Sequence, residues 1–111
     1  MSQIEQPVEI DVAELSAWHR TGRDVVVLDV REDWELATVA LDGARHIPMR
    51  QVPDRIGELP VDKPLVVMCH HGGRSRQVTA WLRQNGFSQA INLAGGIHAW
   101  AEQIDPSLAT Y

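Results

Sequence analysis

Three short apolar runs along the chain predict buried β-strands. Residues 25–28 and 65–68 are rich in valine and leucine and lack the polar alternation of a half-exposed strand. Continuous apolar runs of this kind are typical of a parallel sheet that is covered on both faces. Residues 90–93, Ala-Ile-Asn-Leu, form a weaker third run.

Apolar residues also recur with helical spacing. Asp11 is suited to cap a helix, with Glu14 three residues on, and Thr21 and Gly22 end that pattern. The three predicted helical stripes are Val12, Leu15 and Trp18; Val78, Trp81 and Leu82; and Ile97, Trp100, Ala101 and Ile104. A further helix around residues 50–59 is less regular because it contains Pro53. We expect the tryptophans of the stripes to pack in the core.

The alternation of strands and helices predicts an α/β domain with helices on both faces of a mostly parallel sheet. In such sheets, ligands bind beyond the carboxyl ends of the strands. The first apolar run is followed by Asp29 and the second by Cys69. Both residues are therefore expected at the functional edge of the sheet.

Length and composition limit the architecture. A chain of 111 residues, 44% of them hydrophobic, suffices for one core, so we expect residues 1–111 to form a single domain. Cys69 is the only cysteine, which excludes an intramolecular disulfide and a zinc site built from several thiolates. It also favours a reducing compartment.

The net charge of −5 argues against nucleic-acid and anionic-membrane partners. The first 15 residues hold four acids and no basic residue, so they do not resemble a secretory signal. No run reaches the roughly 18 apolar residues of a membrane span. We therefore expect a cytoplasmic protein.

The charge is unevenly distributed along the chain. Residues 1–62 hold 6 basic and 13 acidic residues, and residues 63–111 hold 4 basic and 2 acidic ones. Between Pro64 and Ala101 there is no Asp or Glu. This carboxylate-free stretch favours a site that handles anions.

One segment of this stretch combines several features that favour a thiolate. Between the second apolar run and the following helical stripe lie Cys69, His70, His71, Gly72, Gly73, Arg74 and Ser75. Adjacent glycines allow backbone N–H groups to turn toward one point, and a helix N-terminus adds partial positive charge. An ordinary thiol with a pKa of about 8.5 is only about 3% ionised at pH 7. These features lower the pKa of Cys69 and so increase its thiolate fraction, which makes Cys69 a candidate nucleophile.

This segment resembles the rhodanese-like domains of the sulfurtransferase superfamily. Their single-domain members often carry Cys-x-x-Gly-x-Arg-Ser after a buried strand, matched here by Cys69, Gly72, Arg74 and Ser75. The resemblance continues through residues 28–32, Gly43-Ala44, Ile47-Pro48, Gly95-Gly96-Ile97 and Trp100. Ala40 departs from the histidine that many members carry before the Gly-Ala pair. The resemblance implies a three-layer α/β/α domain with a mostly parallel sheet of roughly five strands.

The number of residues between the cysteine and the arginine distinguishes phosphatase loops from sulfurtransferase loops. Tyrosine-type phosphatases carry Cys-x5-Arg, a ring wide enough for a tetrahedral phosphate, whereas Cys69 and Arg74 give Cys-x4-Arg. The tighter loop suits a terminal sulfur atom. A phosphatase or arsenate reductase is therefore disfavoured.

The resemblance implies thiosulfate sulfurtransferase activity without a metal or organic cofactor. The Cys69 thiolate would take the outer sulfur of thiosulfate or a similar anionic donor and become a persulfide. N–H groups of residues 70–75 would stabilise that sulfur, and a protein thiol or biosynthetic acceptor would remove it. Arg74 would fix the loop or steer the donor.

The alternative is a non-catalytic persulfide carrier or partner-binding module, which would use the same loop. The C-terminal segment resembles that of rhodanese domains fused behind adenylyltransferases, and the matching residues are Asp105, Pro106, Ser107, Leu108 and Tyr111. The donor, the acceptor and the oligomeric state stay open.

Other polar residues have structural interpretations. Asp29 and Arg31 are expected to form an ion pair near the edge of the sheet. Because adjacent side chains diverge, His70 and His71 are expected at the rim of the site and not in a metal site with Cys69. We expect His46 and His98 to be structural.

Overall fold

The computed structural model describes residues 7–111, and its centre is a parallel sheet. The five strands lie in the order β1-β5-β4-β2-β3. Their bounds are β1 Glu9–Ile10, β2 Val26–Asp29, β3 Arg45–His46, β4 Leu65–Met68 and β5 Ala90–Leu93. The predicted α/β class with a parallel, five-stranded sheet is confirmed. Residues 1–6, which begin the acidic N-terminal segment, lie outside the described residues.

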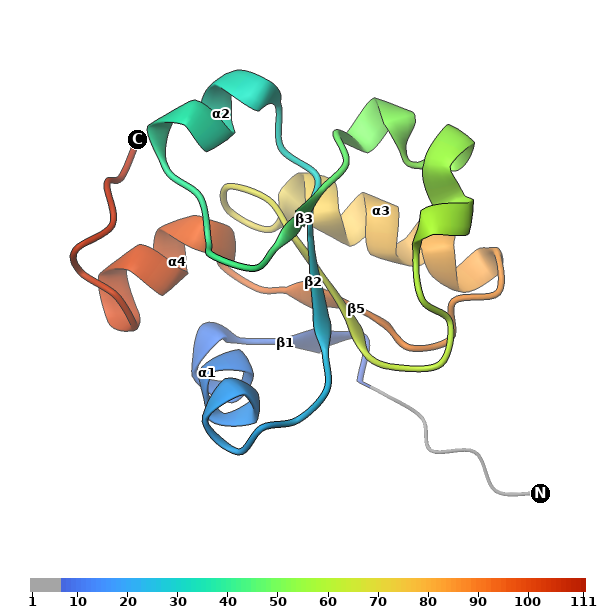
Figure 1. Cartoon of the computed structure of the whole chain (residues 1–111), viewed down its shortest axis with the longest axis horizontal. Coiled ribbons are helices and arrows are strands. Elements are labelled where there is room, and N and C mark those ends of the chain that lie inside the picture. The colour runs from blue at the N-terminus through green and yellow to red at the C-terminus, as the bar shows by residue number, and fades with distance from the viewer. Residues whose placement is uncertain (1–6) are drawn as a thin grey trace.

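Helices cover both faces of this sheet (Figure 1). On one face, α1 (Val12–Arg20) packs beside α4 (Gly96–Gln103). On the other, α3 (Gly73–Gln84) lies with the 3-10 helices η1 (Met49–Gln51) and η2 (Pro53–Glu58). The three helices predicted from the apolar stripes are therefore confirmed.

Strand β4 explains why its sequence is apolar without alternation. Leu65 and Val67 pack into the core on the α3 face, and Val66 and Met68 pack into the core on the α1 and α4 face. Successive side chains of a strand point to opposite faces, so a strand covered on both sides must be apolar at every position.

Two helical segments differ from the expectation. Residues 50–59 form no single α-helix, because Pro53 cannot donate a backbone hydrogen bond and the chain continues as two 3-10 helices. Helix α2 (Asp33–Thr38) was not predicted. Glu32 and Glu35 begin it with a reciprocal capping box.

The carboxyl edge of the sheet brings distant segments together. Asp29 ends β2 and Cys69 follows β4, and these two strands are neighbours. The amino end of α4 meets the same edge, because the N–H of Ile97 donates to the Cys69 carbonyl at 3.0 Å. The predicted functional edge therefore contains both residues. Within residues 7–111, no helix has the length and apolar character that crossing a membrane requires.

Candidate active site

Cys69 begins the segment of residues 69–75, which runs from the end of β4 into the first turn of α3 and is called here the Cys69 loop. Its Sγ accepts the N–H of Gly72 at 3.1 Å and the N–H of Ser75 at 3.4 Å, and the Ser75 hydroxyl lies at 3.4 Å. Cys69 is 1% exposed. The sulfur is thus held by backbone donors at the positive end of a helix, as predicted for a thiolate.

The pKa of Cys69 reflects two opposing influences. Burial is the largest and raises the pKa, since it disfavours the charged form. Hydrogen bonds from the hydroxyl and N–H of Ser75 and from the N–H of Gly72, together with the charge of Arg74, lower it. The net effect is a pKa below the ordinary value, which favours the nucleophilic thiolate.

Two glycines give the Cys69 loop its shape. Gly72 has a φ of 105°, a left-handed conformation that other residues rarely adopt. Gly96 has a φ of 58°, and a Cβ there would collide with the backbone carbonyls of Cys69 and His70. Those carbonyls accept the N–H groups of Ile97 and His98. The close approach of α4 therefore fixes the backbone that carries Cys69.

Buried polar side chains support the loop from β5. The Ser75 hydroxyl lies 2.5 Å from Asn92 Oδ1, and Asn92 Nδ2 donates to Glu9 at 2.7 Å and to the Gly72 carbonyl at 3.2 Å. Ser75 has one hydroxyl proton, so it serves either Asn92 Oδ1 or Cys69 Sγ at any moment. Because a thiolate accepts more strongly than a thiol, ionisation of Cys69 favours the bond to sulfur.

Arg74 is paired with a buried carboxylate. Its guanidinium forms two hydrogen bonds with Glu35, at 2.6 and 2.8 Å, and Glu35 also accepts the Tyr111 hydroxyl at 2.6 Å. Arg31 donates to Tyr111 at 3.0 Å and pairs with Asp29 at 2.7 Å, so the expected ion pair is confirmed. The Arg74 hydrogen bonds hold the pKa of Glu35 at about 2, despite its burial.

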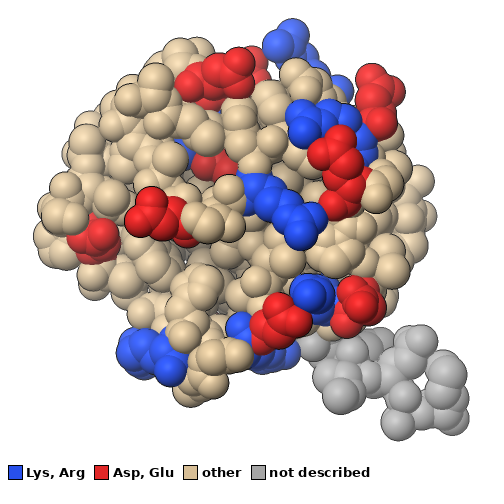
Figure 2. All heavy atoms as spheres, viewed as in Figure 1, with Lys and Arg blue, Asp and Glu red and all other residues tan. Residues whose placement is uncertain are grey.

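The carboxylate-free stretch of the sequence is not free of carboxylates in space. Glu35 comes from α2 to pair with Arg74, and Glu9 comes from β1 to pair with Arg76 at 3.1 Å. Figure 2 shows basic and acidic side chains interspersed on one face of the molecule. The absence of acidic residues from this stretch of the sequence therefore does not keep carboxylates away from its arginines.

The two adjacent histidines of the loop do not diverge as expected. The ring centroids of His70 and His71 lie 3.9 Å apart, and His98 from α4 lies 4.9 Å from His71. His70 also stacks on Tyr111, with centroids 3.8 Å apart. Burial and the neighbouring His71 lower the pKa of His70. The expectation that these side chains separate is wrong, because the loop turns both toward α4.

The predicted site residues fall in one loop, but sequence patterns missed their partners. His46, expected to be structural, lies 2.6 Å from the Arg31 carbonyl through its Nε2. Asn92 carried a signal, since it is a polar residue in an apolar buried strand. Glu35 carried none, because an acidic residue is ordinary at a surface, and Tyr111 was noted only through the resemblance of the C-terminal segment.

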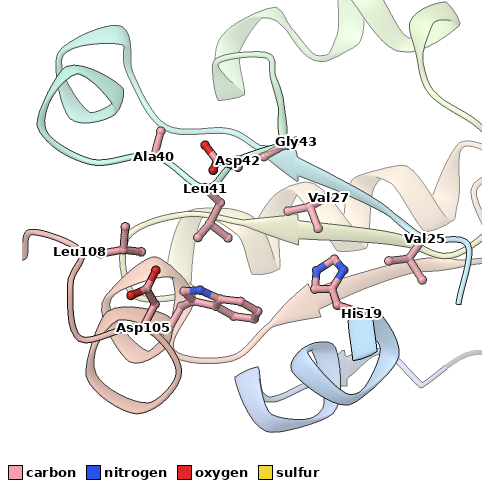
Figure 3. A pocket seen from close by; sticks show the side chains of 11 residues that line it. His19, Val25, Val27, Ala40, Leu41, Asp42, Gly43, Asp105 and Leu108 are labelled. Atoms are coloured by element: carbon pink, nitrogen blue, oxygen red, sulfur yellow. The ribbon is translucent and has the colours of Figure 1, made fainter. Parts of the chain in front are cut away.

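A separate hollow of about 450 Å³ lies away from Cys69. Figure 3 shows its lining between the residues after α2, such as Leu41 and Asp42, and residues of α1 and the segment after α4, such as His19 and Asp105. Cys69 and the other residues of its loop do not line it. This hollow is therefore separate from the Cys69 loop.

Comparison with known proteins places this arrangement in a family. The model for the rhodanese-like domain matches residues 11–103. A protein of Allochromatium vinosum named sulfurtransferase is 39% identical over 91% of this chain and 94% of its own length. A protein of Stutzerimonas stutzeri named thiosulfate sulfurtransferase GlpE is 36% identical over 68% of this chain and 69% of its own length.

A solved structure agrees with these matches. The rhodanese-like domain protein from Staphylococcus aureus superposes with a TM-score of 0.80 at 32% identity, over 93% of this chain and 97% of that one. Some relatives are longer, and this chain spans only 34% and 26% of two curated ones. The sequence match, the parallel sheet and the cysteine loop at its carboxyl edge together establish that the chain belongs to the rhodanese-like domain family.

Proposed function

We propose that this protein is a sulfurtransferase that moves a sulfane sulfur from thiosulfate or a similar anionic donor through a persulfide on Cys69. The observation that carries the proposal is the position of Cys69 Sγ, 3.1–3.4 Å from two backbone N–H groups and one hydroxyl. The names of the relatives support the activity, and that of the GlpE protein supports thiosulfate as donor.

In the first step, the Cys69 thiolate attacks the outer sulfur of thiosulfate. A bond forms between Sγ and that sulfur, the sulfur–sulfur bond of the donor breaks, and sulfite leaves with the electron pair. The total charge of −3 is conserved, as one thiolate and one thiosulfate become one persulfide anion and one sulfite. The N–H groups of Gly72 and Ser75 stabilise the sulfur anion without a metal.

In the second step, a thiophilic acceptor attacks the outer persulfide sulfur and regenerates the thiolate. Cyanide in an assay gives thiocyanate, and a protein thiol or a biosynthetic acceptor plays this part in the cell. Gly73 leaves space beside the loop, since nothing lies within 4 Å of a Cβ placed there, whereas Gly72 packs against the backbone of Leu93 and Gly95. Arg74 and Glu35 keep the loop in place during both steps.

The test is the intact mass of the protein after exposure to thiosulfate. Wild type gains one sulfur atom, Cys69→Ser gains none, and added cyanide removes the sulfur as thiocyanate. A wild-type protein that stays unmodified, or a Cys69→Ser variant that gains the same mass, overturns the proposal. Cleavage of an aryl phosphate in place of sulfur uptake also overturns it.

The same experiment separates an enzyme from a carrier. Repeated release of thiocyanate under excess thiosulfate and cyanide supports catalysis. Formation of the persulfide with negligible turnover favours a carrier or partner-binding module. Ser75→Ala is the matched variant, because it keeps Cys69 and the backbone N–H of Ser75 but removes one donor to sulfur.

A further inference from the structure

Three of the five histidines meet at the edge of the Cys69 loop. His70 and His71 come from the loop and His98 from the first turn of α4. One ring nitrogen of each lies within 4.8 Å of the others. The proposed sulfur chemistry uses none of these rings, so their convergence has no explanation in that reaction.

Two of the ring nitrogens are buried without a partner. Among residues 7–111, Nε2 of His70 and Nδ1 of His98 are inaccessible to solvent and have no hydrogen bond. A buried polar atom of this kind costs free energy unless something binds it. His70 also stacks on Tyr111 through its ring face, and Nε2 has no hydrogen bond in this arrangement.

His98 has the orientation of a metal ligand. Its Nε2 lies 3.4 Å from Glu102 Oε1, one helical turn along α4, and its Nδ1 is the buried nitrogen that has no hydrogen bond. Metal-binding histidines usually donate the N–H of their other ring nitrogen to a carboxylate, which fixes the tautomer and makes the ligand nitrogen more basic. Glu102 is the carboxylate nearest to Nε2 that can take this part, after a small movement of its exposed side chain.

We propose that His70, His71 and His98 form a binding site for a divalent transition-metal ion of the zinc class. Neutral imidazoles suit Zn²⁺, Ni²⁺ and Cu²⁺, and three of them leave a fourth position for water or an anion. His70 binds through Nε2 and His98 through Nδ1, because these are the buried nitrogens that lack partners. Cys69 is not a ligand of this site.

The side chains need only a small adjustment. Zinc–nitrogen bonds of about 2.0–2.1 Å put the ligand nitrogens of a tetrahedral site about 3.4 Å apart, compared with the 4.8 Å that bounds the cluster here. His71 is exposed and can rotate, whereas His70 and His98 are partly buried. His71 therefore closes the site around the ion.

The test is calorimetric titration of the tag-free, full chain with Zn²⁺. Wild type binds one ion per chain, and His71→Asn and His98→Asn each weaken binding by more than about 100-fold, more than the loss of an outer partner usually costs. Glu102→Gln weakens it by about 10-fold, within the range for such a partner. Absence of stoichiometric binding overturns the proposal.

Two controls separate this site from others on the chain. His19→Asn removes an exposed histidine outside the cluster and leaves the affinity unchanged. Cys69→Ser also retains zinc, and Co²⁺ bound to wild type shows no thiolate-to-cobalt charge-transfer band. Loss of binding in Cys69→Ser, or unchanged binding in both His71→Asn and His98→Asn, contradicts the proposed ligands.

Folding is checked in the same samples. Zinc raises the melting temperature of wild type and of His19→Asn, since an ion that binds only the folded chain stabilises it. It leaves the melting temperature of His71→Asn unchanged. Because His71 is exposed, this variant is expected to fold even if His98→Asn does not. A zinc-dependent increase in His71→Asn equal to that of wild type overturns the proposal.

Discussion

Strands β2 and β4 are neighbours and end at the same edge of the sheet, yet they handle an anionic side chain in opposite ways. After β4, Cys69 Sγ is surrounded by N–H and O–H dipoles. At the end of β2, the Asp29 carboxylate contacts the full charge of Arg31 at 2.7 Å, with both side chains buried. Arg31 holds the Asp29 carboxylate in a buried ion pair, whereas the hydrogen bonds of Gly72 and Ser75 lower the pKa of Cys69 without a charged group in contact with its sulfur.

Glu35 connects the two strand ends. It binds Arg74 of the Cys69 loop on one side and Tyr111 on the other, and Tyr111 contacts Arg31 beside Asp29. Arg74 is thereby neutralised, so its contribution at Cys69 is weaker than its place in the sequence suggests. The different environments of Asp29 at the end of β2 and Cys69 after β4 depend on these contacts. Substitutions at either strand end therefore test them.

Arg31→Met gives the largest expected effect. It leaves the Asp29 carboxylate buried without its partner, and breaking a buried pair costs about 3–5 kcal/mol. Urea unfolding at pH 7 measures the loss. The double variant Asp29→Leu with Arg31→Met removes the stranded charge and recovers part of the stability. A single variant as stable as wild type would contradict the structural role of the pair.

Glu35→Gln is expected to cost about as much at neutral pH. The pKa of Glu35 falls from its ordinary value of 4.5 to about 2, chiefly through Arg74, and this corresponds to about 3 kcal/mol of stability. Because the folded-state pKa is the lower one, wild type keeps this stability above about pH 4.5 and loses it as the pH falls to about 2.

Urea unfolding between pH 7 and pH 2.5 measures this contribution. The difference in stability between wild type and Glu35→Gln is largest at pH 7 and shrinks toward pH 2.5. A difference that stays constant across this range would show that the charge of Glu35 is not what stabilises the fold.

Gly96→Ala perturbs the backbone at the end of β4. Its Cβ would meet the carbonyls of Cys69 and His70, so the Cys69 loop must move. A displacement of about 1 Å can cost about 100-fold in rate, and we expect a loss of that order in thiocyanate formation. Gly86→Ala is the control, since Gly86 also has a positive φ but has nothing within 4 Å of the added Cβ. Equal losses in the two variants would point to backbone strain alone.

Ser75→Ala gives the smallest effect and tests the dipoles around sulfur directly. Removing the hydroxyl raises the pKa of Cys69, because one donor to the thiolate is lost while the Ser75 and Gly72 N–H groups stay. The rate of alkylation by iodoacetamide as a function of pH reports this pKa. An unchanged profile would mean that the hydroxyl serves Asn92 alone.

Periodicity predicted the central strands, three helices and the edge where Cys69 lies, because burial on both faces leaves a local mark in the sequence. Strands β1 and β3 were not predicted, since two residues are too few to show a period. Helix α2 was missed because its strongest determinant is the capping box between Glu32 and Glu35, and its apolar face is short.

The Cys69 loop consists of consecutive residues, so the sequence by itself determined the candidate nucleophile, the glycines beside it and the helix that follows. Tertiary structure decided which charges and rings surround it. Glu35 reaches Arg74 across 39 positions and Tyr111 reaches Glu35 across 76, and His98 joins His70 only because α4 returns to the same edge. Such contacts produce no regular spacing of residues in the sequence, because they depend on how parallel strands and their helices pack.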